Sequence, residues 1–178
     1  MIYVAPSAVI TGDVAVREGS SIWHGAVLRG DLDAIIVGRY VSLQENAVVH
    51  VDVGNPVAIG DKVTIGHGAV VHGCTVGAEC ILGMASVVQS RARVGPGCII
   101  AAGAVVAEGV EIPADSIAAG VPARVVRKVE DHHRLRIDLS WRVYYELAQK
   151  SLPAKPDLAG DPGKRVRIEG VPDLEGTF

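Results

Sequence analysis

Branched aliphatic residues recur every six positions along the first two thirds of this 178-residue chain. The step runs from Val4 to Ala118, with short excesses before Val37 and Ile59 and one five-residue step to Val76, and 18 of the 19 positions are Val, Ile or Leu. A helical period of 3.6 fails throughout this stretch. The spacing instead predicts short strands joined by tight corners, with each aliphatic side chain pointing inward.

A second column of small or β-branched residues lies four positions after the aliphatic one and includes Thr75, Cys80 and Cys98. We interpret these residues as core fillers at the narrow corners of a coil. Gly often follows the aliphatic residue directly, as Gly60 and Gly77 do, and we attribute this to the unusual backbone dihedrals that Gly permits. Stacked coils of this kind bury one continuous core, in which each coil supports its neighbours.

The six-residue register stops after Ala118, and a helical pattern follows. Because Pro153 bars continuation, we expect a helix from about residue 129 to 150 that lies against the coils. The apolar positions at helical spacing are Val129, Leu135, Leu139, Val143 and Leu147. The adjacent His132 and His133 occur in a charged stretch, and we expect them on the solvated face of this helix.

These patterns divide the chain into three parts. Residues 1–122 are expected to form the stacked coils, and residues 123–152 a linker and the helix. Residues 153–178, which are rich in Pro, Gly and charge, are expected to form an extended or partly disordered tail.

Charge and composition narrow the class of protein. Seventeen Lys and Arg residues against 20 Asp and Glu give a net charge of −3 without a basic block, which excludes nucleic acid as the main partner. No apolar run approaches the roughly 20 residues of a membrane span, and the N-terminus lacks the pattern of a secretory signal. Three cysteines without a CxxC pair favour a reducing compartment, so we expect a cytoplasmic protein.

Coil arithmetic with three repeats per coil places Arg29, His50 and His72 on one face, pointing outward, with neighbours about 4.8 Å apart. Two imidazoles at that separation can share a metal ion, and three histidines with an open fourth position form hydrating and hydrolytic zinc sites. His67 lies around the corner, so we infer that a neighbouring subunit supplies it in a closed trimer. The alternative is an oligomer interface in which the three histidines form hydrogen bonds without metal.

At these residues the sequence resembles the γ-class carbonic anhydrase family, over about residues 1–150. The matching stretches are SIWHGAVLRGDLDAI, SLQENAVVH, IGHGAVVHGC and AAGVPARVVRKV. The resemblance implies an all-β fold, a left-handed parallel β-helix of hexapeptide repeats with a C-terminal α-helix, assembled as a homotrimer. It also implies a Zn²⁺ ion, or Fe²⁺ or Co²⁺, held between subunits by His50, His67 and His72.

The resemblance further implies reversible hydration of CO₂ to bicarbonate and assigns roles to four more residues. Arg29 and Asp31 match an ion pair across the subunit interface. Gln44 matches a residue that hydrogen-bonds the metal-bound water, and Tyr144 occupies the place of a tyrosine directed toward the site.

The sequence departs from the family pattern in its acidic residues. Leu32 follows Asp31 where the best-studied relatives carry an acid, and the loop after His50 offers only Asp52, so we expect proton export to limit turnover. Three alternatives stay open because fold alone does not give function. They are a hexapeptide acyltransferase that binds acyl-CoA between subunits, a metal-dependent acyl-CoA thioesterase, and a catalytically weak binding or scaffold homologue.

Overall fold

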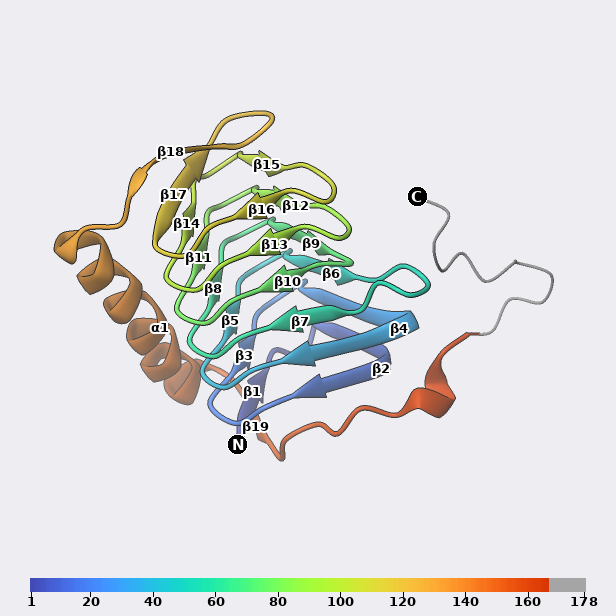
Figure 1. Ribbon diagram of the computed structural model, residues 1–178. Helices are drawn as coiled ribbons and strands as arrows, with labels where there is room; N and C mark the ends of the chain where they lie inside the picture. The colour runs from blue at the N-terminus through green and yellow to red at the C-terminus, as the bar shows by residue number, and fades with distance from the viewer. Residues whose placement is uncertain (167–178) are drawn as a thin grey trace.

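The computed structural model describes residues 1–166 and shows a three-sided parallel β-helix with one long helix along its side (Figure 1). Each short strand pairs in parallel with the strands one coil above and below it. Ile81 of one coil, for example, lies opposite Thr64 of the preceding coil and Ile99 of the next. The predicted architecture of short strands and tight corners is confirmed.

A nine-stranded sheet forms the side that the helix covers. In spatial order its strands are β18 (Arg124–Lys128), β17 (Ser116–Ala119), β14 (Ile99–Ile100), β11 (Ile81–Leu82), β8 (Thr64–Ile65), β5 (Ser42–Leu43), β3 (Ser21–Ile22), β1 (Ile2–Val4) and β19 (Ala154–Lys155). The strands at the two ends of this order, β18 and β19, pair antiparallel with their neighbours.

A ten-stranded sheet forms the other two sides, which meet in β4. Its strands are β15 (Val105–Val106), β12 (Val87–Val88), β9 (Val70–His72), β6 (Val48–His50), β4 (Val27–Val37), β7 (Val57–Ile59), β10 (Thr75–Val76), β13 (Arg93–Val94) and β16 (Glu111–Ile112), with β2 (Val9–Val16) paired to β4. The first residues of β4 pair with β6 and its last residues with β7, so β4 turns a corner between two sides.

The inward aliphatic column forms the core. Eighteen of its 19 positions are buried and Ile10 is partly buried, and Cys80 and Cys98 are buried as predicted. Thr75 is exposed, contrary to the prediction, and Cys74 is buried in its place. The five-residue step to Val76 shortens this corner by one residue, which moves the inward position from Thr75 to Cys74.

The glycines that follow the aliphatic column are explained by the close approach of adjacent coils. A Cβ atom on Gly60 would lie 2.5 Å from the backbone nitrogen of Ala78, and one on Gly77 would lie 2.5 Å from that of Pro96. The positive φ angles fall at other glycines, such as Gly68. The dihedral explanation was therefore wrong for Gly60 and Gly77, where a side chain would push two coils apart.

Helix α1 (Asp131–Ser151) occupies the range predicted for it and lies along the nine-stranded sheet (Figure 1). Its buried apolar residues are Ile137 and Ala148. Aromatic side chains add to this face: Trp141, for example, packs against Tyr40 with ring centres 5.4 Å apart. The helix is therefore held by aromatic contacts together with the aliphatic contact of Ile137 with the isoleucines of the sheet.

The predicted packing face of α1 was wrong for four of its five positions, since Val129 is buried. The other four residues are 43–58% exposed and form one stripe along the helix, here called the helix stripe: Leu135, Leu139, Val143 and Leu147. The helix carries two apolar faces, and the aromatic one meets the sheet. The helix stripe is therefore about half exposed in the protomer.

The start of α1 also differs from the prediction for His133, which is only 6% exposed. Its Nδ1 accepts a hydrogen bond from the backbone N–H of Glu130 at 3.1 Å, and the Glu130 side chain accepts one from the backbone of His133. This reciprocal cap satisfies two of the N–H groups that a helix start leaves unpaired. His132 is exposed, as expected.

Beyond α1 the described chain runs extended below the first coil (Figure 1). β19 pairs with β1, Leu158 bridges to Val16, and a short 3₁₀ helix, η1 (Pro162–Lys164), follows. The predicted tail thus begins as an extended segment with partners on the β-helix, while its residues 167–178 lie outside the described part. Within residues 1–166, no helix has the length and apolarity to cross a membrane.

Candidate metal centre

The outward histidines of β6 and β9 meet on one side of the β-helix. Strand register sets Arg29 opposite His50 and His50 opposite His72, as the coil arithmetic predicts. Nδ1 of His50 lies 3.0 Å from Nε2 of His72. The two side chains are 15% and 31% exposed, so solvent reaches both rings.

The far nitrogens of the two rings are already engaged. Nε2 of His50 lies 3.1 Å from a carboxylate oxygen of Asp31, which can only accept. Nδ1 of His72 lies 2.9 Å from the hydroxyl oxygen of Ser90, and that hydroxyl donates to Asp52 at 2.6 Å. Because Ser90 gives its only proton to Asp52, it must accept from His72, and the network assigns an N–H to each far nitrogen.

This assignment leaves a lone pair on both nitrogens that face each other. Two lone pairs 3.0 Å apart repel unless a proton or a metal ion lies between them. Neutral imidazoles whose far N–H groups are held by carboxylate or hydroxyl oxygens are the form in which histidine binds metals. The His50–His72 pair therefore has the donor chemistry of a metal site.

Asp31 connects the histidine pair to Arg29. Its other carboxylate oxygen pairs with the guanidinium of Arg29. Burial acts to raise the pKa of Asp31, but the hydrogen bonds from Arg29 and His50 outweigh it and hold the pKa below the ordinary value of 3.8. The carboxylate stays ionised at neutral pH and keeps the N–H of His50 turned toward it.

His67 does not join this pair within one protomer. It follows β8 at the corner between two sides of the β-helix, and its Nδ1 lies 2.7 Å from a carboxylate oxygen of Glu45. This is an ion-pair contact and not a hydrogen bond. If a neutral His67 carries its proton on Nδ1, next to this carboxylate, its lone pair is on Nε2. The structure thus brings His50 and His72 together and leaves His67 on a separate surface, 45% exposed.

His67 lines a groove between α1 and the nine-stranded sheet. The groove has a volume of about 790 Å³ and mostly apolar walls. Gln44, which is 4% exposed, and Tyr144 line it with His67, while Arg127 and Arg136 line it near the start of α1. The groove therefore combines an apolar body, a polar region around His67 and a cationic region.

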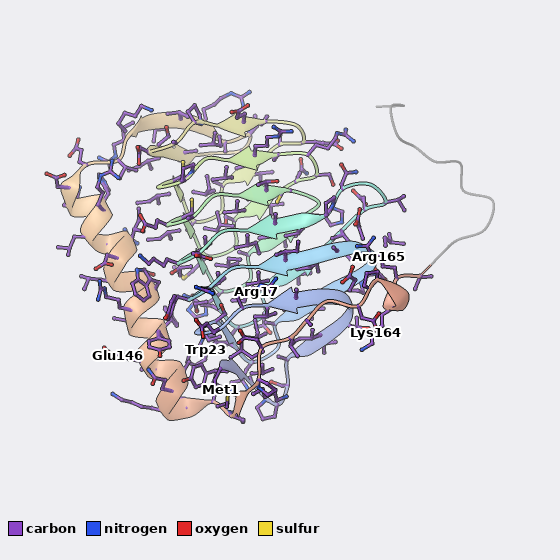
Figure 2. The ribbon with its side chains drawn as sticks, turned by 60° about the horizontal axis from the view of Figure 1, so that its bottom comes forward. Met1, Arg17, Trp23, Glu146, Lys164 and Arg165 are labelled. Carbon is purple, nitrogen blue, oxygen red and sulfur yellow. The ribbon has the colours of Figure 1, made fainter. Side chains whose placement is uncertain are left out.

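Tyr144 packs edge-on against Trp23, with ring centres 5.8 Å apart. Figure 2 shows Trp23 beside the helix, where it is 9% exposed. Burial and the negative charge of Glu45 raise the pKa of the Tyr144 hydroxyl. The hydroxyl therefore keeps its proton at neutral pH and can donate a hydrogen bond within the groove.

Sequence reasoning missed the partners that orient the rings. Ser90 lies 18 residues after His72, one coil further along the same column, so the coil arithmetic could have found it. Glu45 and His67 are 22 residues apart, which is one coil plus the four-residue excess of the loop between them. No spacing rule leads to the contact of Asp52 with Ser90, because Asp52 belongs to that irregular loop.

A second group of candidate ligands occurs at the start of α1. Glu130, His132 and His133 each place one ligand atom within 4.8 Å of the others. Nδ1 of His133 already accepts the N–H of Glu130, so this group serves the helix cap.

Known proteins with similar sequences identify the family. Residues 73–108 match the family described as bacterial transferase hexapeptide (six repeats). The chain is 42% identical to gamma carbonic anhydrase 2, mitochondrial, of Arabidopsis thaliana, over 83% of this chain and 55% of that protein. It is 43% identical to the probable carbonic anhydrase of Methanocaldococcus jannaschii, over 82% of this chain and 92% of that protein.

The chain belongs to the γ-class carbonic anhydrase family of hexapeptide-repeat proteins. Membership confirms the predicted left-handed β-helix. The chain spans about half the length of the Arabidopsis relative, so the activity of that whole protein is not carried over directly.

Relatives of this γ-class carbonic anhydrase family member also carry other names. The carnitine operon protein CaiE of Escherichia coli is 34% identical, over 97% of this chain and 89% of that protein. The crystal structure of a hexapeptide transferase family protein from Anaplasma phagocytophilum is 36% identical, with a TM-score of 0.76 over 85% of this chain and 93% of that one. The reaction must therefore be argued from the site.

Proposed function

We propose that the protein is a γ-class carbonic anhydrase, which hydrates CO₂ reversibly to bicarbonate at a metal site shared between protomers of a homotrimer. The observation that carries the proposal is the His50–His72 pair, whose facing nitrogens both bear lone pairs while hydrogen bonds hold their far nitrogens. Family membership supports the same reaction.

The donor set fits a small divalent cation. Two nitrogens bound at about 2.0–2.1 Å to a tetrahedral ion lie roughly 3.3 Å apart, close to the 3.0 Å between His50 and His72. His67 of a neighbouring protomer would add the third nitrogen and leave one position open. We propose Zn²⁺, with Fe²⁺ or Co²⁺ as alternatives, because imidazole suits all three.

Two partly exposed apolar surfaces support the assembly. Outward valines of adjacent strands line up next to the column of Arg29, His50 and His72, all partly exposed: Val27, Val48, Val70, Val87 and Val105. The helix stripe lies near His67, on another side. Burying the valines of one protomer against the helix stripe of the next would bring His67 to the histidine pair, and three such contacts close a ring on a three-sided prism.

When bound, the ion lowers the pKa of water to about 7 and so supplies a nucleophile near neutral pH. Asp31 and Ser90 accept hydrogen bonds from the far nitrogens of His50 and His72 and so present the lone pairs of these two rings, while Glu45 lies beside Nδ1 of His67. The buried amide of Gln44 lies in the same groove as His67, where it can orient water against CO₂.

Proton release falls to solvent buffer in this chain. Leu32 packs against the core and offers no carboxylate, and Asp52 already accepts the hydroxyl of Ser90. We therefore expect turnover to depend on buffer concentration, since Leu32 stands directly after Asp31 where relatives carry an acid.

The groove favours a second candidate, a metal-dependent acyl-CoA thioesterase. A volume of about 790 Å³ far exceeds the needs of CO₂, and Arg127 and Arg136 would suit the phosphates of an extended thioester. Thioester cleavage by the metal-loaded protein, measured beside CO₂ hydration, separates the two candidates.

We also propose a cytoplasmic location. All three cysteines are free and buried, which suits a reducing compartment. The Arabidopsis relative is named as mitochondrial, so fractionation of cells that express this protein is the direct check.

The decisive experiment measures metal content and CO₂ hydration of purified protein loaded in turn with Zn²⁺, Fe²⁺ and Co²⁺. His50→Ala and His72→Ala should remove both bound metal and activity while the fold remains, because neither ring belongs to the core. Equal hydration rates in the unmodified protein and both variants would refute the proposal.

A further inference from the structure

The segment after α1 ends on the corner of the β-helix that carries Asp31. Figures 1 and 2 show it passing below the first coil, so that Lys164 and Arg165 come to lie beside β2 and β4. The backbone N–H of Val166 donates to the carbonyl oxygen of Asp31. A segment distant in sequence therefore contacts the residue that orients His50.

Arg165 pairs with two acidic residues of this corner. Its Nε and one terminal nitrogen lie 2.9 and 2.6 Å from the same carboxylate oxygen of Asp13, and its other terminal nitrogen lies 3.6 Å from Asp33. Asp13 is only 5% exposed, and within residues 1–166 Arg165 is the one cation that pairs with it. Because a buried carboxylate without its counter-charge is strongly destabilising, the segment and the corner are coupled.

A displacement of β2 at this corner is transmitted to β4, because the backbones of the two strands are in close contact there. β2 and β4 pair on both sides of it, with an irregularity in the register between Gly12 and Val14. A Cβ atom on Gly12 would lie 2.2 Å from the carbonyl oxygen of Gly30, the residue directly before Asp31. Neither strand can shift here without moving the other.

Charge balance links Arg165 to the histidine pair. The carboxylates of Asp13, Asp31 and Asp33 belong to this corner, and the cations that pair with them are Arg29 and Arg165. Without Arg165, the uncompensated charge of Asp13 and Asp33 would attract Arg29 and repel Asp31. The carboxylate that orients the histidine pair would then lose its own partner.

We propose that Arg165 is a positioning residue that fixes the β4 corner, so that Asp31 holds His50 with its Nδ1 facing His72. The proposal rests on the proposed function in treating His50 as a metal ligand. The orientation of the ring belongs to one protomer and can be measured without metal.

The test compares R165Q with K164Q, which removes a positive charge from the exposed neighbouring residue. In the metal-free protein at one fixed pH, the imidazole ¹⁵N resonances of His50 report which ring nitrogen carries the proton. We expect R165Q to shift these resonances and to weaken Zn²⁺ binding about tenfold, the lower range for a residue that supports a ligand. R165K should restore the His50 resonances and Zn²⁺ binding only in part, because lysine keeps the positive charge but cannot bridge two carboxylates with a planar fork. K164Q should change neither the resonances nor Zn²⁺ binding.

Unchanged His50 resonances in folded R165Q protein, even with a lower Tm, would show a purely structural role and overturn the proposal. If R165Q does not fold, D33N decides, because it keeps the pair with Asp13. A shift of the His50 resonances in D33N relative to the unmodified protein would then support the proposal, and no shift would overturn it. If the His50 resonances shift in R165Q but the unmodified protein binds no Zn²⁺, the positioning role of Arg165 is supported. Only the proposed metal site would then be refuted.

Discussion

Two surfaces of the protomer carry exposed or partly exposed histidines beside carboxylates, and they differ in how many imidazoles come together. On the β6–β9 side, His50 and His72 face each other with two lone pairs 3.0 Å apart. At the corner after β8, His67 has only an ion-pair contact with Glu45, and no second histidine faces its ring among the described residues. In the proposed assembly the first surface would supply two metal ligands and the second surface one, so the site would be completed only between protomers.

The largest expected effect comes from removing His67, the proposed third ligand. His67→Ala should remove CO₂ hydration as fully as His72→Ala does, although His67 touches neither member of the pair within a protomer. Because His67 is 45% exposed, Tm should change little. A stopped-flow hydration assay with elemental analysis checks this, and full activity with a full complement of metal would place the third ligand elsewhere.

Mixing the two variants sharpens the comparison. Inactive His67→Ala and inactive His72→Ala protomers, co-assembled at equal amounts, should recover about a quarter of the sites, because each site of the proposed assembly would draw its pair and its third ligand from different protomers. Activity of the co-expressed and purified mixture measures this fraction. Zero recovery in mixed oligomers, shown by mass spectrometry to be mixed, would mean that all three ligands come from one chain.

The column of outward residues on the β6–β9 side was predictable from sequence, because in a solenoid the spacing along the chain sets the position in space. Each six-residue repeat occupies one side of the β-helix, and each coil of three repeats lies one strand spacing beyond the last. The column of Arg29, His50 and His72 can therefore be predicted from spacing alone, without information on packing. The same arithmetic failed at Thr75, where a single shortened corner changed which residue points inward.

The C-terminal part was predictable only as a helix and an extended segment. Which face of α1 meets the sheet depends on the fit of whole aromatic surfaces, so the helix stripe was assigned to the wrong side. The burial of His133 and the pairing of Arg165 with Asp13, 152 residues away, depend on where separate elements dock. No local period encodes such contacts.

A smaller effect on metal binding should follow from a change that frees the His72 ring to rotate but leaves both histidines of the His50–His72 pair in place. Ser90→Ala takes away the acceptor of the His72 N–H, so the ring can turn and Zn²⁺ affinity should fall about ten- to a hundredfold. Ser86→Ala is the matched control, since Ser86 is buried and its hydroxyl has no hydrogen-bond partner among the described residues. Competition titration with a chelator measures both, and an equal loss in the two variants would deny that Ser90 orients the ring.

The smallest effect concerns a buried and an exposed histidine at the start of α1. Burial, followed by the charges of His132 and Arg127, lowers the pKa of His133 below the ordinary value of 6.5, although Glu130 acts against this. Its neutral Nδ1 accepts the cap hydrogen bond, so the unfolded chain binds a proton more readily than the folded one as pH falls. Stability from this group is present above pH 6.5 and is lost as the pH falls from there toward the lowered pKa.

His133→Asn should flatten this loss, because an amide oxygen can accept the same N–H without titrating. His132→Asn should leave the slope nearly as it is, since His132 is exposed and accepts no cap hydrogen bond. Urea unfolding of the three proteins across this pH range measures the slopes. If His133→Asn and the unmodified protein lose stability in parallel, the acid sensitivity arises elsewhere, and the cap histidine is held no differently from its exposed neighbour.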